Sequence, residues 1–165
     1  MAAAALVALA ERLQGICVGR RLTVATAESC TGGLIAETIT SVPGSSAYFV
    51  GALVTYADEA KSAILGVPAD TLAAHGAVSA QVARAMATGA RERLDVSLAV
   101  SVTGIAGPDG GSEAKPVGLT YVGLAGPDGV EVHKLQLAGD RDANRRAATA
   151  AALEWLIEAA EAATP

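Results

Sequence analysis

Aromatic, cysteine and basic residues are all scarce in this sequence of 165 residues. Phe, Trp and Tyr together make up only 3% of it, so the core has to be built from Ala, Val, Leu and Ile. The two cysteines, Cys17 and Cys30, are too few for a disulfide framework and match no metal motif, which favours reduced thiols and a cytoplasmic location. A net charge of −5 without any block of Lys or Arg argues against a nucleic-acid partner.

Long hydrophobic runs are missing as well. No run reaches the length of a membrane span, so no membrane partner is expected. The Ala-rich start lacks the positive region of a signal peptide, and Leu6, Leu9 and Leu13 recur at helical spacing. With 52% hydrophobic and 18% charged residues, the composition is typical of a folded protein, and the length favours a single domain over residues 1–165.

Helix and strand patterns alternate along the chain, and two of the strands run into Gly-rich turns. This order predicts a three-layer α/β/α domain. The turn signal from Gly126 to Gly129 predicts a hairpin, so the sheet has to be mixed, although mostly parallel. We expect Asp58 and Ser79 to cap the helices that follow them. The expected helices cover residues 3–17, 32–40, 59–65, 69–74, 79–91 and 142–162, and the expected strands cover 22–27, the later part of 45–56, 96–102, 117–125 and 130–137.

The first Gly-rich turn, Thr26–Gly33, concentrates hydroxyls, a thiol and a carboxylate between a strand and a helix. Ligands of open α/β sheets bind at the carboxyl ends of the strands. We therefore expect this turn to hold an anionic substrate and Ser29 to supply a hydroxyl for chemistry. A helix cap alone would need one Ser or Thr, and Glu28 alone would complement the helix dipole. The paired glycines, Gly32 and Gly33, add close backbone approach and positive φ.

A serine nucleophile needs a base, and histidine is an unpromising source here. His75 lies in a turn without an obvious partner, and His133 lies in a strand pattern typical of a solvated residue. A lysine whose pKa is lowered by burial or by neighbouring cations is the other available base. Lys61 follows the strand that ends near Tyr56 and is the candidate. An ordinary exposed helix lysine is the competing interpretation.

Three further segments carry polar groups that suit a ligand. The Ser45–Ser46 loop offers two hydroxyls, although a plain turn also explains it. Thr103 and Gly104 open a loop whose backbone N–H groups can cradle an anion, or that simply closes a buried strand. Arg141 and Arg145 begin the last helix, where cations oppose the helix dipole; a phosphate or carboxylate ligand would justify them, and so would solvation at the surface.

Together these segments resemble the C-terminal domain of the competence-damage-inducible (CinA) proteins, whose stand-alone members are nicotinamide-nucleotide amidohydrolases. The resemblance runs over about residues 5 to 160. Two positions depart from the family pattern: Gly51-Ala52 replaces a usual glycine pair, and Asp58 replaces a usual asparagine. An extra carboxylate there can pair with Lys61 and hold it protonated. The motifs that carry the resemblance are residues 27–33, 43–49, Tyr56 with Lys61, 65–67, 76–79, 102–108, 115–118 and 139–141.

The resemblance implies hydrolysis of the carboxamide of nicotinamide mononucleotide by a serine and a lysine, without metal or cofactor. It implies Ser29 as nucleophile and Lys61 as general base. Tyr56 and Ser46 would relay the proton or orient the amide, and Ser46 is the reserve nucleophile. Arg141 and Arg145 would hold the phosphate, and Thr103 with nearby N–H groups would stabilise the oxyanion or hold the phosphate. The residues expected to bind substrate are Glu28, Thr31, Gly32, Gly33, Ser45, Thr103, Gly104, Arg141 and Arg145.

The resemblance also implies a small nucleotide as the binding partner and a homo-oligomer. Two alternatives stay open at this point. The first alternative is a nucleotide- or partner-binding module that is linked to competence and no longer catalyses a reaction. The second is a serine/lysine amidase that acts on another small amide. Asp58 keeps the first alternative open, and release of ammonia from nicotinamide mononucleotide separates all three.

Overall fold

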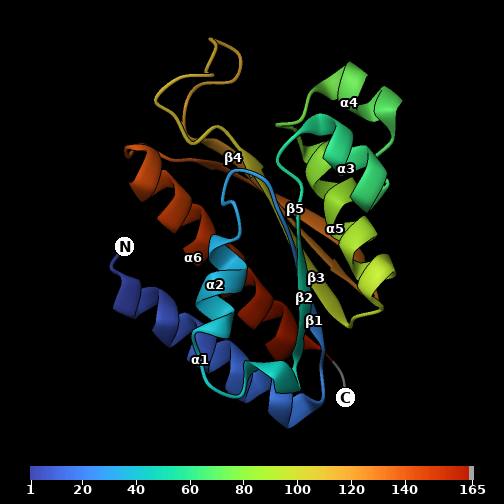
Figure 1. The fold of residues 1–165 in the computed structure, drawn as a ribbon, viewed down its shortest axis with the longest axis vertical. Coiled ribbons are helices and arrows are strands. Elements are labelled where there is room, and N and C mark those ends of the chain that lie inside the picture. Colours follow the sequence, from blue (N-terminus) through green and yellow to red (C-terminus); the bar gives the residue numbers. More distant parts are fainter. Residues whose placement is uncertain (164–165) are drawn as a thin grey trace.

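A five-stranded sheet with helices on both faces forms the computed structural model, which describes residues 1–163 (Figure 1). The order of elements is the one predicted from the sequence, with one added 3-10 turn. The helices are α1 Ala3–Arg20, α2 Leu34–Thr40, α3 Asp58–Leu65, α4 Ala69–His75, α5 Ala80–Leu94 and α6 Arg141–Ala162, the 3-10 turn η1 is Ser45–Ala47, and the strands are β1 Val24–Glu28, β2 Phe49–Val54, β3 Leu98–Gly104, β4 Leu119–Gly126 and β5 Gly129–Gln136.

The strand order in the sheet is β2-β1-β3-β4-β5. β1 runs parallel to both β2 and β3, whereas β4 runs antiparallel to both β3 and β5. The predicted mixed sheet is confirmed, but the expectation of a mostly parallel one is wrong, because two pairings are parallel and two antiparallel. The reason is the chain after β3: it returns through a loop and a tight hairpin, and a parallel pairing needs a longer crossover.

Successive residues of each strand face opposite sides of the sheet, which divides the core in two. Val24 and Val100 pack with α1, α2 and α6, whereas Ala25 and Ala99 pack with α3 and α5. Small residues let α5 lie close to its neighbours. A Cβ on Gly89 would come within 1.9 Å of the Leu65 carbonyl oxygen, so this glycine is what allows α3 to end against α5.

Two predicted helix caps have different outcomes. The Ser79 hydroxyl accepts a hydrogen bond from the Val82 N–H at 3.3 Å, which confirms that cap. The Asp58 cap is wrong: Ala57 is the N-cap, and Asp58 lies in the first turn of α3 without a capping bond. An acidic residue in the first turn still complements the helix dipole. Asp58 therefore stabilises the start of α3, as the predicted cap would, but through its charge instead of a capping hydrogen bond.

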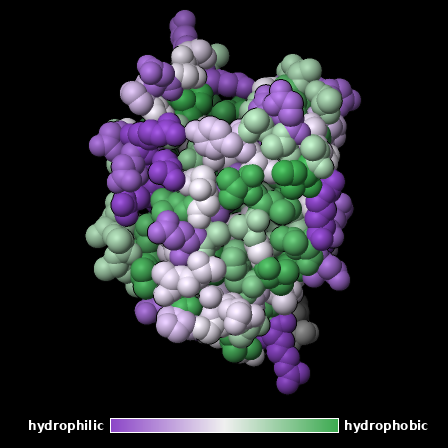
Figure 2. All heavy atoms as spheres, viewed as in Figure 1, coloured by the Kyte–Doolittle hydropathy of each residue, from purple (hydrophilic) through white to green (hydrophobic). Residues whose placement is uncertain are grey.

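The two edges of the sheet differ in character. β2 is one edge and carries Val50 and Val54, which are 50% and 46% exposed. Figure 2 shows hydrophobic residues gathered over the part of this face where Figure 1 draws β2. β5 is the other edge and carries Glu131, His133 and Lys134. Within residues 1–163, no helix has the combined length and apolar character that a membrane crossing requires.

Candidate functional site

The three parallel strands end at one edge of the sheet and gather three of the predicted segments there. Glu28, the last residue of β1, pairs with Val54 of β2 and Val102 of β3. The Ser29 N–H donates to the Val102 carbonyl at 3.0 Å. The turn after β1, the segment from Thr55 to Lys61 and the loop after Thr103 therefore meet at the carboxyl edge, which is the ligand side of open α/β sheets.

The Glu28 carboxylate organises the first turn from inside. Its side chain is fully buried, and its oxygens accept hydrogen bonds from the N–H groups of Gly33 at 3.0 Å, Ile35 at 3.1 Å and Ala36 at 2.9 Å. These are donors that the start of a helix otherwise leaves unpaired. Glu28, predicted to bind substrate, thus braces the start of α2 in this structure.

Gly32 and Gly33 give the turn its shape. Their φ angles are +59° and +98°, a region that disfavours residues with a Cβ. The Gly32 N–H donates to the Ser29 carbonyl at 3.0 Å, and the Gly33 N–H is one of the Glu28 donors. Both glycines predicted to bind substrate therefore use their N–H donors within the turn, and they shape the backbone that carries Ser29, which is 8% exposed.

Lys61 is buried at the same edge, with 1% of the residue exposed. Its ammonium donates to the carbonyl oxygens of Thr55 at 3.1 Å and Tyr56 at 3.0 Å. The interpretation as an ordinary exposed helix lysine is therefore wrong. In the described residues, no hydrogen bond joins Ser29 to Lys61, and such contacts often tighten only when substrate binds.

Burial lowers the pKa of Lys61 below its usual value of 10.5, and Asp58 opposes this. The Asp58 Oδ1 lies 3.7 Å from Nζ, and its side chain is 58% exposed. Water therefore screens this ion pair, and desolvation determines the net direction. A neutral amine keeps two N–H donors and one lone pair. The carbonyls of Thr55 and Tyr56 can accept both N–H groups of the neutral Lys61 amine. The nitrogen lone pair is then free to accept a proton.

The two arginines at the start of α6 bind backbone carbonyls of the site. Arg145 donates from Nε to Cys30 at 3.2 Å and from Nη2 to Thr31 at 2.8 Å. Arg141 donates to the Gly107 carbonyl at 2.9 Å and to the Tyr56 hydroxyl at 3.0 Å. These bonds place both guanidinium charges at the carboxyl edge and tie α6 to the other segments there.

The Thr103 loop is held by residues that are distant in sequence. The Thr103 hydroxyl is buried and donates to the Ala77 carbonyl at 2.8 Å, so its proton points away from a ligand in this structure. A Cβ on Gly104 would come within 2.6 Å of the Thr120 hydroxyl oxygen. Gly104 is therefore required by close packing.

Asn144 is a site residue that the sequence interpretation missed. Its buried amide donates to the carbonyls of Ala106 at 3.0 Å and Gly139 at 2.9 Å, and its oxygen accepts from the Gly139 N–H at 2.9 Å. The side chain thus joins the second Gly-rich loop to α6. A signal was present, because asparagine has low helix propensity and stands near the start of an Ala-rich helix.

Two buried hydroxyls at this edge lack partners in residues 1–163. These are Oγ1 of Thr31, a predicted binding residue, and Oγ1 of Thr55, which precedes Tyr56. An unpaired buried hydroxyl costs about 1–3 kcal/mol. Such groups in native proteins are commonly satisfied by ordered water or a ligand, so the pair is consistent with a binding site here.

Ser45 and Ser46 lie at the opposite end of the sheet from Ser29 within one chain. They form η1 just before β2, and β2 runs parallel to β1. Tyr48, which follows η1, accepts a hydrogen bond from the Val24 N–H at the start of β1. Ser46 therefore lies where β2 begins, whereas Ser29 lies where β1 ends. Because the two strands are parallel, these positions are at opposite ends of the sheet, and the expectation that the Ser46 loop and Ser29 share one site is not met within a single chain.

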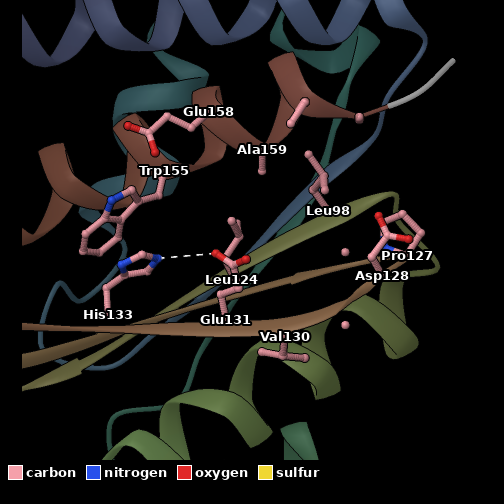
Figure 3. Close-up of a pocket in the computed structure, with 14 residues that line it drawn as sticks. Leu98, Leu124, Pro127, Asp128, Val130, Glu131, His133, Trp155, Glu158 and Ala159 are labelled. Atoms are coloured by element: carbon pink, nitrogen blue, oxygen red, sulfur yellow. Dashed lines mark ion pairs between the residues drawn. The ribbon is translucent and has the colours of Figure 1, made fainter.

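The same amino edge carries a cavity of about 640 Å³ between the β4–β5 hairpin and α6 (Figure 3). His133 stacks on Trp155 with ring centroids 4.0 Å apart, and its Nε2 lies 3.7 Å from Glu131 Oε2. The cavity includes none of the predicted catalytic residues. Among residues 1–163, no group of three or more His, Cys, Asp or Glu side chains is arranged to hold a metal ion.

Comparison with known proteins places this geometry in a family. Residues 6–160 match the family model described as the CinA C-terminal domain. A CinA-like protein of Geobacter sulfurreducens is 61% identical over 135 residues, which are 82% of this chain and 33% of that protein. The chain therefore spans about a third of the length of the curated relatives it matches.

Solved structures agree with this match. The competence/damage inducible protein CihA from Agrobacterium tumefaciens has a TM-score of 0.91 at 45% identity, covering 93% of this chain and 94% of that chain. A competence-damaged protein (CinA) superfamily protein from Escherichia coli has a TM-score of 0.90 at 32% identity, covering 93% of this chain and 90% of that chain.

Proposed function

This chain belongs to the CinA C-terminal domain family, and we propose that it hydrolyses the carboxamide of nicotinamide mononucleotide to nicotinic acid mononucleotide and ammonia. The observation that carries the proposal is Lys61. It is buried, its pKa is lowered, and two carbonyls hold it at the strand edge where Ser29 lies. A buried titratable group whose pKa is shifted, at an edge where ligands bind, is a mark of a functional site.

The chemistry follows from these two groups. The Ser29 hydroxyl attacks the carboxamide carbon while neutral Lys61 takes its proton. The tetrahedral intermediate collapses, protonated Lys61 gives the proton to the leaving nitrogen, and ammonia departs from an acyl-enzyme. Lys61 then takes a proton from water, which attacks the ester, and returns it to the Ser29 oxygen as the nicotinic acid product leaves.

The substrate carries a phosphate, and Arg141 and Arg145 supply cationic groups for it. Their bonds to carbonyls of the turn and of the Gly-rich loop hold the guanidinium groups at fixed positions, which limits the entropy lost when an anion binds. Tyr56 is 61% exposed and accepts a bond from Arg141, so its ring is available beside the phosphate or the pyridine ring.

One observation favours a second candidate, a nucleotide-binding module without turnover. Asp58 lies 3.7 Å from the Lys61 ammonium, and a carboxylate at that distance favours the protonated lysine, which is not a base. The exposure of Asp58 weakens this effect, so hydrolysis remains the proposal and binding alone becomes an outcome of its test.

The deciding experiment measures ammonia released from nicotinamide mononucleotide by the purified protein. We expect release by the wild type, loss of at least about 10³-fold in Ser29→Ala, and unchanged release in the control Ser41→Ala at the end of α2. We also expect Ser29→Ala to lose at least as much as Ser46→Ala; the reverse order would move the nucleophile to Ser46. Binding without release supports the module, and neither binding nor release points to a different amide.

A further inference from the structure

Ser29 and Thr55 are neighbours across two parallel strands at the carboxyl edge. The last pair in the register of β1 and β2 joins Glu28 to Val54. The ladder continues one residue further, because the Thr55 N–H donates to the Glu28 carbonyl at 2.9 Å and the Ser29 N–H donates to the Val102 carbonyl at 3.0 Å. Ser29 and Thr55 therefore occupy the next position on adjacent strands, which lie about 4.8 Å apart in a sheet.

Both side chains face the helix that carries Lys61. Side chains alternate between the two faces of a strand, and Ala27 and Leu53 stand two residues before Ser29 and Thr55. Both pack in the core on the side of the sheet that α3 and α5 cover (Figure 1). Lys61 lies on α3, and its ammonium donates to the Thr55 carbonyl at 3.1 Å. The Thr55 hydroxyl therefore lies close to this ammonium as well as to Ser29.

Thr55 has a hydroxyl that is not committed to another bond. The residue is 0% exposed, and its Oγ1 has no hydrogen-bond partner among residues 1–163. The other candidates for a proton relay are occupied or distant. Thr103 donates its proton to a backbone carbonyl, Tyr56 is 61% exposed and accepts a bond from Arg141, and Ser46 lies at the amino edge. A buried hydroxyl is costly unless a partner satisfies it, and the two nearest polar side chains are the proposed nucleophile and base.

We propose that the Thr55 hydroxyl bridges Ser29 and Lys61 and relays the proton between them. A hydroxyl can accept and donate at the same time. As the Ser29 oxygen bonds to the carboxamide carbon, its proton passes to Thr55 Oγ1 while the Thr55 proton passes to the lone pair of neutral Lys61. Thr55 ends the step as a neutral hydroxyl, and Lys61 carries the charge. The relay rests on the proposed function, whereas the contacts of Thr55 do not.

The variant Thr55→Val tests the relay, because it keeps the shape of the side chain and removes only the hydroxyl. We expect kcat to fall at least about 10²-fold with little change in KM. Thr55→Ser keeps a hydroxyl at this position and should retain most of the wild-type kcat. Thr38→Val is the matched control, since Thr38 is buried on α2 and its hydroxyl bonds within that helix. Full kcat in Thr55→Val, or a loss in Thr55→Ser as large as in Thr55→Val, overturns the relay.

Urea denaturation separates the relay from a structural role. In Thr55→Val, Lys61 keeps both of its carbonyl partners, and a buried hydroxyl without a protein partner is replaced by an apolar group. We therefore expect Thr55→Val to be at least as stable as the wild type. A loss of stability larger than that of Thr38→Val contradicts the proposal, because the fall in kcat would then follow from a disturbed fold.

The pKa of Lys61 tests one contact of Thr55 without any turnover. The chain has three lysines, Lys61, Lys115 and Lys134, so ¹³C-labelled lysine gives few side-chain signals, and Lys61→Met identifies the one required. An ammonium has three donors; two bind carbonyls, and the third is available to Thr55 Oγ1. Loss of this acceptor disfavours the charged form, so we expect Thr55→Val to lower the Lys61 pKa by about half a unit or more. An unchanged pKa overturns the contact.

A crystal structure tests both contacts directly. We expect Thr55 Oγ1 within about 3.2 Å of both Ser29 Oγ and Lys61 Nζ. A separation of more than about 4 Å from either atom exceeds a hydrogen bond and overturns the bridge. If the wild type releases no ammonia from nicotinamide mononucleotide, the proposed function fails. The lysine titration and the two distances then still decide whether Thr55 joins Ser29 to Lys61.

Discussion

The carboxyl and amino edges of the parallel strands differ in whether their charged side chains are buried or exposed. At the carboxyl edge Glu28 and Lys61 are buried, with 0% and 1% exposed, and backbone groups satisfy both. At the amino edge the cavity near Trp155 is roomy, but Glu131 on its rim has a side chain 79% exposed. Burying a charge is costly unless it is paired or hydrogen-bonded. Desolvated charges therefore mark the candidate site better than cavity volume does.

Replacing the buried lysine is the strongest way to break this contrast. Lys61→Met removes the proposed base and keeps much of the buried stem, so we expect turnover to fall by at least about 10³-fold while circular dichroism still reports a folded protein. Lys134→Met on β5, three strands away from β1 in the sheet, is the control lysine change and should leave turnover intact. Full activity of Lys61→Met would exclude the lysine from the mechanism. The buried charges of the carboxyl edge would then no longer distinguish it from the amino edge as the candidate site.

Neutralising Glu28 tests whether the first turn depends on its buried carboxylate. In Glu28→Gln the amide presents N–H donors to the N–H groups of α2, so charge-assisted bonds are lost. We expect the free energy of unfolding to fall by about 3 kcal/mol, measured by urea denaturation. Glu131→Gln, at an exposed position, should change it by less than about 0.5 kcal/mol. Equal effects of the two changes would show that burial does not distinguish them.

Shortening an arginine tests the phosphate assignment. Arg145→Ala should raise KM about ten- to fiftyfold with a smaller change in kcat, which is the mark of binding lost equally from substrate and transition state. His133→Ala in the amino-edge cavity should leave both constants unchanged. An unaltered KM for both Arg141→Ala and Arg145→Ala would exclude these residues from the phosphate site.

The smallest expected effect concerns pH. Asp58 favours the charged form of Lys61, so Asp58→Asn should lower the lysine pKa further. The active base is the neutral amine, so the rise of kcat/KM with pH then occurs at lower pH. Because the Asp58 side chain is 58% exposed, we expect a shift of less than about one pH unit. Asp70→Asn on α4 is the control, and a shift to higher pH would contradict the assignment.

Much of the fold could be predicted from local patterns. The hairpin at Gly126–Gly129, the cap at Ser79 and the Gly-rich turn before α2 are each specified by neighbouring residues whose hydrogen bonds close within a few positions. The even split of strand pairings was less predictable, because it depends on the long loop after β3. The Asp58 cap failed by one residue, a common error since several residues near a helix start compete for the cap.

The candidate site divides along the same line. The sequence by itself determined the chemical groups and the turn that holds Ser29, because glycine conformations and short-range hydrogen bonds are local. The tertiary structure decided that Lys61 is buried and donates to the Thr55 and Tyr56 carbonyls, and that Asn144 joins the second Gly-rich loop to α6. It also decided that Ser46 lies at the amino edge of the parallel strands, opposite Ser29. Burial and strand direction depend on which distant segments pack together, and no short stretch of sequence contains that information.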